Sequence, residues 1–236
     1  MLYVNGDSWS QETDYTKPDQ IWPSLLANKL GLTIFNESIG CGSNSRILDN
    51  LTNFYIGGNR PKLIVLAFTA HHRWHLPNKN FGSWNIGPAV AISDITGEKD
   101  NILREWVYKN SYYELDSVYR YYRTIWSLTQ LCKKFECPYM FFQAWDKELI
   151  DLKLLDVEEN IIKFVSKFYP NINDYYAKRY VNAFKFFQQD KDMCNNVEYV
   201  LKDLLSDNDL DSTQHPDANG HIKIADFIYS KIGEIT

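Results

Sequence analysis

Short apolar runs alternate with amphipathic stretches along the chain, and this alternation constrains the fold more than any other feature. The run at residues 63–67 has no polar residue, which is typical of a strand buried on both faces of a sheet. Runs at 2–5, 33–37 and 139–143 predict three further strands. Because strands that alternate with helices form mainly parallel sheets covered on both faces, the sequence predicts an α/β fold.

The stretches between these runs carry helix caps and helical periodicity. Residues 20–30 have Pro23 in their first turn, where its missing N–H costs little, and Gly31 follows as a C-cap. The next helix is expected to start near Ser43, a good N-cap, and it has four apolar residues on one face: Ile47, Leu48, Leu51 and Phe54. Three later helices are predicted at 115–135, 195–205 and 218–232.

Two segments, near 75–112 and 146–192, interrupt this alternation. The first has no steady period, and a loop of this length in a compact domain is usually functional or disordered. Its tryptophans argue against disorder and favour a folded insertion beside a functional site, and the second segment, rich in Phe and Tyr, is expected to be helical. Since no repeat or clear linker occurs, residues 1–236 are expected to form one domain with two insertions.

Composition excludes several classes of function. A net charge of −5 argues against nucleic acid as the main partner, because phosphate binding needs a basic surface. No stretch approaches the roughly 20 apolar residues of a membrane span, and no signal peptide is recognised. The four cysteines are expected to be reduced packing residues: Cys41, Cys132, Cys137 and Cys194. These features favour a cytoplasmic protein, in the host cytoplasm or the virion if it is viral.

Polar residues near the two ends of the chain have the chemistry of a nucleophile, a base and an orienting acid. Ser8 follows the first predicted strand, and Asp211 and His215 lie in the sequence DSTQHP. A serine hydroxyl needs an adjacent base, and an imidazole with a pKa of about 6.5 suits proton transfer near neutrality. Each residue also has a plain structural interpretation, as a helix cap, a solvated loop acid and a turn histidine held by Pro216.

This pattern resembles the SGNH, or GDSL, hydrolase superfamily in four short blocks. They are GDSW at 6–9, NESIGCGSN at 36–44, AFTA at 67–70 after the third strand, and the Asp/His cluster at 211–216. The GDSW start, the GxGSN turn at 40–44 and the pair Thr69 and Arg73 after the third strand also look like small SGNH-type proteins of bacteriophages. The resemblance implies a flavodoxin-like three-layer α/β/α sandwich with a mainly parallel sheet of about five strands.

The resemblance also implies catalytic roles. Ser8 is the expected nucleophile, His215 the base and Asp211 the orienting acid. The family usually has Asp-x-x-His, whereas this chain has one residue more, so a bulge is expected to let the Asp211 carboxylate reach a ring nitrogen. Asp209 is the less favoured acid, and a backbone carbonyl could replace both and leave a Ser–His dyad.

An oxyanion hole is implied by the same blocks. Its expected donors are the backbone N–H groups of Ser8 and Gly42 and the side chain of Thr69, which stands where the family usually has Asn. Asn44 is an auxiliary donor. The interpretation of these glycines as ordinary turn residues stays open.

Further residues beside these blocks are candidate substrate contacts. Arg73 could bind a substrate carboxylate or phosphate, or pair with an internal acid, and Trp9 and Trp74 are candidates for stacking on a sugar. The sequence HHRWH at 71–75 is interpreted as loop histidines and not as a metal site. His221, on the opening turn of the last predicted helix, is interpreted as structural.

Together these residues predict a serine esterase, a carboxylic ester hydrolase of SGNH type. Its substrate would be a small acyl ester, such as an O-acetylated carbohydrate, and no metal or organic cofactor is needed. An acyltransferase would use the same acyl-enzyme with a sugar hydroxyl in place of water. A degenerate SGNH protein that binds glycan is the other alternative, which Thr69 and the altered Asp–His spacing favour.

Overall fold

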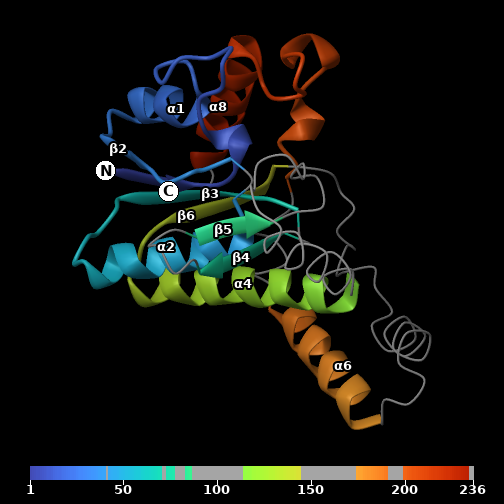
Figure 1. Cartoon of the computed structure of the whole chain (residues 1–236). Coiled ribbons are helices and arrows are strands. Elements are labelled where there is room, and N and C mark those ends of the chain that lie inside the picture. Colours follow the sequence, from blue (N-terminus) through green and yellow to red (C-terminus); the bar gives the residue numbers. More distant parts are fainter. Residues whose placement is uncertain are drawn as a thin grey trace.

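The computed structural model describes residues 1–40, 42–70, 73–77, 83–86, 114–144, 174–190 and 199–233 (Figure 1). Backbone alone is described for 74–77, 83–86, 114–117 and 174–179. Most of the two predicted insertions therefore lies outside the described residues. The parts within them are an antiparallel ribbon of β4 (Trp74–Pro77) and β5 (Ser83–Ile86), and the helix α6 (Asp174–Gln189).

A parallel four-stranded sheet forms the centre of the molecule, in the order β2-β1-β3-β6. Its strands are β1 (Leu2–Asn5), β2 (Ile34–Asn36), β3 (Leu63–Phe68) and β6 (Tyr139–Gln143). A single parallel bridge from Gln143 to Val200 continues the sheet beyond β6. The resulting order is that of flavodoxin-like sheets, and it reverses between β1 and β3, where such sheets bind ligands at the carboxyl ends of their strands.

Helices cover both faces of this sheet (Figure 1). On one face lie α1 (Trp22–Leu30) and α8 (Ala218–Ile232), which pack against each other. On the other lie α2 (Asn44–Ile56) and α4 (Glu114–Lys134), with α6 packed on the outer side of α4. These layers confirm the predicted three-layer α/β/α fold.

Alternating side chains of the strands build two separate cores. In β3, Ile64, Leu66 and Phe68 belong to the core under α2 and α4, whereas Leu63, Val65 and Ala67 belong to the core under α1 and α8. All six residues are buried, as the unbroken apolar run predicts. Burial of each large apolar side chain contributes about 1.5–3 kcal/mol, so these two cores hold the sheet edge and its loops in place.

Capping residues set the helix ends that the sequence predicted. Gly31 ends α1 in the left-handed conformation at φ 63°, and the Ser43 side chain accepts the Arg46 N–H at the start of α2. The helix predicted at 195–205 is wrong over the described residues 199–205. There Leu201 N donates to Gln143 O at 2.7 Å, which pairs this segment with the sheet, and only a 3₁₀ turn, η3 (Lys202–Leu204), follows.

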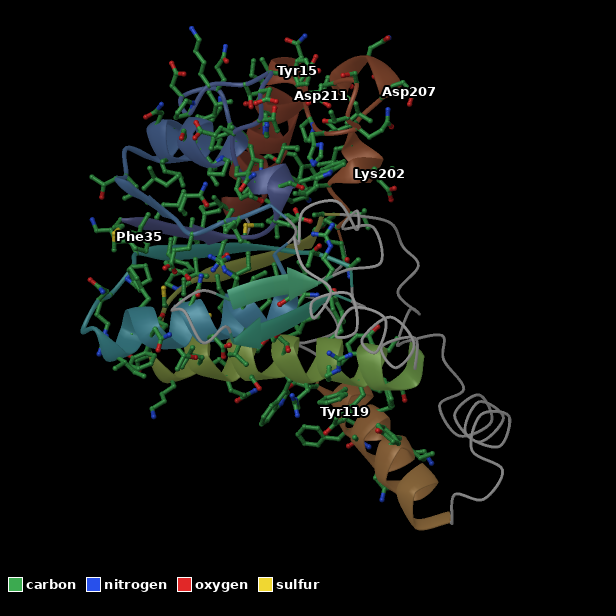
Figure 2. All side chains as sticks on the ribbon, viewed as in Figure 1. Tyr15, Phe35, Tyr119, Lys202, Asp207 and Asp211 are labelled. Atoms are coloured by element: carbon green, nitrogen blue, oxygen red, sulfur yellow. The ribbon has the colours of Figure 1, made fainter. Side chains whose placement is uncertain are left out.

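Many aromatic side chains pack within the interior and between helices. Tyr119 of α4 meets Tyr180 and Phe184 of α6 with ring centroids 5.4 and 6.3 Å apart (Figure 2 labels Tyr119). Trp9 and Trp22 are fully buried. In the described part of the chain, the aromatic excess therefore serves packing to a large extent.

Two of the four cysteines, Cys132 and Cys137, are buried free thiols, and the other two lie outside the described residues. Burial raises the pKa of both described thiols, which keeps them protonated at neutral pH. Among the described helices, none has the length and apolar character needed to cross a membrane.

Candidate active site

Ser8 follows the carboxyl end of β1 and is the first residue of the 3₁₀ turn η1 (Ser8–Ser10). The Asp7 carboxylate caps this turn, since its Oδ1 accepts the Trp9 N–H at 3.0 Å. Gly6 lets the turn lie close to β3, because a Cβ there would lie 2.6 Å from Ser10 Oγ and 3.0 Å from Ala67 O. The sequence Gly-Asp-Ser therefore presents a partly exposed serine hydroxyl above the sheet edge.

His215 lies across from this turn, and its ring nitrogen Nε2 is 2.8 Å from Ser8 Oγ. It comes from the loop between η4 (Asp207–Asp209) and α8, so the two ends of the chain meet at one edge of the sheet. The loop turns back on itself through Asp211 N to His215 O at 2.8 Å. The extra residue of the Asp-x-x-x-His spacing is accommodated by Gln214, which adopts φ 64°.

Asp211 contacts His215 through its backbone and not through its ring. Its Oδ1 accepts the N–H groups of Thr213 at 2.7 Å and His215 at 3.1 Å. The Thr213 hydroxyl lies between the two side chains, 2.5 Å from Asp211 Oδ1 and 2.9 Å from His215 Nδ1. The expected direct contact between the carboxylate and the ring is therefore replaced by a contact through a threonine.

Donor and acceptor roles in this row of side chains follow from the carboxylate. Burial raises the pKa of the Asp211 carboxyl. The hydrogen bonds from the Thr213 hydroxyl and the two backbone N–H groups lower it by more, so the pKa lies below its ordinary value. An ionised carboxylate only accepts, so Thr213 donates its hydroxyl proton to Asp211. The threonine oxygen then accepts Nδ1–H, which leaves Nε2 of His215 unprotonated and facing the Ser8 hydroxyl.

An ion pair and a close backbone contact hold the His215 loop on α8. Asp209 is buried, and its carboxylate lies 2.6 Å from Lys223 Nζ of α8. Hydrogen bonds from Lys223 and Ser206 lower the pKa of Asp209 to about 2. Asp209 O also accepts the Asp217 N–H at 2.9 Å, and Asp217 caps α8. Asp209 is therefore an anchor of the loop and does not contact the His215 ring.

Behind Ser8 lies a buried polar network of Asp7, Thr69 and Arg73, in which Thr69 and Arg73 have other roles than the sequence predicted. Asp7 Oδ2 accepts the Thr69 hydroxyl at 2.8 Å and Arg73 NH1 at 3.0 Å. Thr69 has no exposed surface and its only hydroxyl proton is used here, which corrects its expected role as an oxyanion donor. Arg73 pairs with an internal acid, the alternative to substrate binding.

The other expected oxyanion donors differ in whether their N–H groups already have an acceptor within the protein. Ser8 N–H has no acceptor among the described residues. Gly42 N–H donates to Ile39 O at 2.9 Å, so it is already used within its own turn. Asn44 donates one amide hydrogen to Thr69 O at 2.8 Å and keeps a second one.

The remaining candidate side chains are placed as follows. Trp9 is fully buried in the core under α1 and α8, so its expected contact with substrate is wrong. The backbone of Trp74 lies in β4, but its side chain is outside the described part. His71 and His72 are also outside it. Within the described residues, no group of three His, Cys, Asp or Glu could hold a metal ion.

His221 joins the two helices beneath the site. It is fully buried, and its Nδ1 accepts the Trp22 N–H at 3.2 Å. Burial lowers the pKa of this histidine to about 4, so the ring is neutral. Sequence reasoning placed His221 on α8 but had no signal for this bond, and it missed Thr213, although Thr213 stands two residues before His215.

No protein-family model matches the sequence, and the search of curated proteins found no match. Among solved structures, TesA aligns over 100% of this chain and 99% of its own, with a TM-score of 0.54 and 12% identity.

Two other solved structures align over nearly their full lengths. The psychrotrophic esterase EstA from Pseudoalteromonas sp. has a TM-score of 0.49 and 12% identity, and covers 99% of this chain and 96% of its own. The acetyl xylan esterase AlAXEase has a TM-score of 0.48 and 15% identity, and covers 98% of this chain and 100% of its own. Similarity at this level concerns the fold. The chain therefore has the three-layer fold that its resemblance to the SGNH hydrolases predicted, and shares it with TesA.

Proposed function

We propose that the chain is a serine esterase in which Ser8 is the nucleophile and His215 the general base. The observation that carries this proposal is the 2.8 Å contact between Ser8 Oγ and His215 Nε2, made by residues 207 positions apart. That distance is within the range from which a base can take the hydroxyl proton. The Nδ1–H tautomer of His215, which the contact with Thr213 favours, leaves Nε2 free to accept the proton and supports the same roles.

The reaction would proceed in two halves. Ser8 Oγ attacks the ester carbonyl while its proton passes to His215 Nε2, and the carbonyl oxygen becomes an oxyanion. When this intermediate collapses, the imidazolium gives the proton to the leaving alcohol and an acyl-Ser8 remains. A water molecule then attacks the acyl group, with His215 again as base, and releases the acid and free Ser8.

The developing oxyanion needs donors that are already in place. Ser8 N–H is one, because it has no acceptor among the described residues. The second amide hydrogen of Asn44 is a further candidate, since Thr69 O and Thr69 N hold this side chain rigidly at 2.8 and 2.9 Å. Loss of one oxyanion-hole donor costs about 10²–10³-fold in kcat in a well-studied protease, which sets the scale for Asn44→Ala.

For the substrate we propose a small acyl ester of an alcohol, with an O-acetylated carbohydrate as the first class to test. The motive is the Trp-rich sequence that follows Arg73, since indole rings stack on sugars. Short-chain p-nitrophenyl esters and acetylated xylan oligosaccharides, with acetate release as readout, provide the test. Acetate release only from aryl esters would refute the carbohydrate part of this proposal.

The matched variants are Ser8→Ala and Ser212→Ala. Ser8→Ala removes the nucleophile and should lower turnover by at least ~10³-fold. Ser212 lies in the same loop as His215, and its hydroxyl contacts Tyr15 at 2.9 Å, so Ser212→Ala should leave turnover within about threefold (Figure 2 shows Tyr15 near Asp211). Turnover that survives in Ser8→Ala would refute the proposed nucleophile.

A further inference from the structure

We infer that Thr213 is a positioning residue that couples Asp211 to the His215 ring, so that the site works with four side chains in a row. This inference rests on the proposed function. Its basis is a continuous set of contacts: Ser8 to His215 at 2.8 Å, His215 to Thr213 at 2.9 Å and Thr213 to Asp211 at 2.5 Å.

The spacing of the loop explains why a hydroxyl is needed there. Asp211 Oδ1 accepts the N–H groups of Thr213 and His215, which holds the carboxylate against the backbone of the turn. In an Asx turn of this kind, the aspartate side chain accepts the backbone N–H of the residue two positions later, here Thr213. A carboxylate held in this way supports the turn, and the Thr213 hydroxyl connects it by two hydrogen bonds to Nδ1 of His215.

The charges in this arrangement have a fixed direction. Asp211 polarises the hydroxyl by accepting its hydrogen bond, and this makes the threonine oxygen a better acceptor for Nδ1–H. When His215 takes the Ser8 proton, the cationic ring keeps that hydrogen bond, which is stronger with a charged donor. No proton passes through Thr213, because its hydroxyl proton remains on Oγ throughout.

Variants at residue 213 separate the hydroxyl from the turn. Thr213→Val keeps the shape and the backbone N–H that bonds Asp211, but it removes the hydroxyl, whereas Thr213→Ser keeps the hydroxyl. We expect Thr213→Val to lower kcat about 10- to 100-fold with little change in KM, because it removes a hydrogen bond to a charged ring. Thr213→Ser should stay within about threefold of the wild type.

Two readouts would not respond to a merely structural threonine. In ¹⁵N NMR of the free protein, the His215 ring should be predominantly the Nδ1–H tautomer in the wild type and in Thr213→Ser, and a mixture in Thr213→Val. The acid limb of the kcat/KM profile should move to lower pH in Thr213→Val, since the imidazolium loses a partner. Asp211 and His221, the titratable groups that interact electrostatically with His215, are unchanged in these variants.

Comparison with the acid completes the test. Asp211→Asn and Thr213→Val should each reduce kcat. The kcat of the double variant should be only slightly below that of the less active single variant, because both substitutions break the same chain of hydrogen bonds to His215. Independent, multiplicative losses would overturn the inference, as would an unchanged tautomer in Thr213→Val. The NMR readout does not require turnover, so failure of the proposed esterase activity would be distinguished from failure of the threonine contact.

Discussion

The buried His221 predicts a specific dependence of stability on pH. Its Nδ1 accepts the backbone N–H of Trp22, which ties α8 to α1, and this bond requires a ring that is unprotonated at Nδ1. Burial holds the pKa near 4 in the folded chain against 6.5 for an ordinary histidine; the charges of Asp217 and Asp211 raise the pKa, and His215 lowers it. Between these two pH values, the unfolded chain binds a proton that the folded chain does not.

The sign and size of the effect follow from linkage. Stability is fully retained above pH 6.5 and is lost as pH falls toward 4, at up to about 1.4 kcal/mol for each pH unit. Over a difference of about 2.5 units between the folded pKa of about 4 and the ordinary value of 6.5, the loss amounts to about 3 kcal/mol. Other titrating groups add their own dependence, so a matched variant is needed to isolate this contribution.

His221→Asn provides that variant, because the amide oxygen of Asn can replace Nδ1 as the acceptor and does not titrate. Urea unfolding of both proteins from pH 7.5 to 4, with the free energy extrapolated to water, measures the difference. We expect the wild type to lose about 3 kcal/mol more than His221→Asn across this range. Parallel pH profiles for the two proteins would refute the reasoning.

Three further predictions concern the polar anchors of the site. Arg73→Met should lower the free energy of unfolding by about 3–5 kcal/mol, because it removes a charged partner of buried Asp7, and adding Asp7→Asn should recover part of the lost stability. A loss below ~1 kcal/mol in urea denaturation would contradict the importance of this ion pair. Gly220→Ala should cost about 1–3 kcal/mol, since its Cβ would lie 2.4 Å from Asp209 O, and an unchanged thermal midpoint would refute the contact. The stability that Asp209 provides is present above its ordinary pKa and is lost as pH falls through about 2. Lys223→Met should therefore move the midpoint of acid unfolding, measured by circular dichroism, to higher pH, and an unmoved midpoint would argue against the ion pair.

Local signals in the sequence predicted the fold class and the elements of the central sheet. The apolar run of β3 identified a strand buried on both faces, and Gly31 and Ser43 identified helix ends, because each acts within a few residues of its own position. The segment 199–205 was predicted wrongly, since its helical composition is overridden by the pairing of Leu201 with Gln143 of β6. Such a contact depends on tertiary structure and has no local signal.

The site was predictable only in part for the same reason. Residue types and order pointed to Ser8 and His215, and the structure brings them to 2.8 Å. The expected exposure of Trp9 was wrong, because its position next to a polar turn does not show which way the side chain points. Thr69 was predicted to be a free donor, but its hydroxyl donates to Asp7, a residue 62 positions away, and no local signal indicates this contact.

Covalent labelling of Ser8 tests the central claim most directly. A serine-directed alkyl phosphonate should add one phosphonyl group to the wild type by intact mass, at Ser8 by peptide mapping, and none to Ser8→Ala. His215→Ala should react at least ~10²-fold more slowly, because the hydroxyl would lack its base. Equal labelling of the wild type and Ser8→Ala, or a rate unaffected by His215→Ala, would contradict the claim that Ser8 is a nucleophile activated by His215.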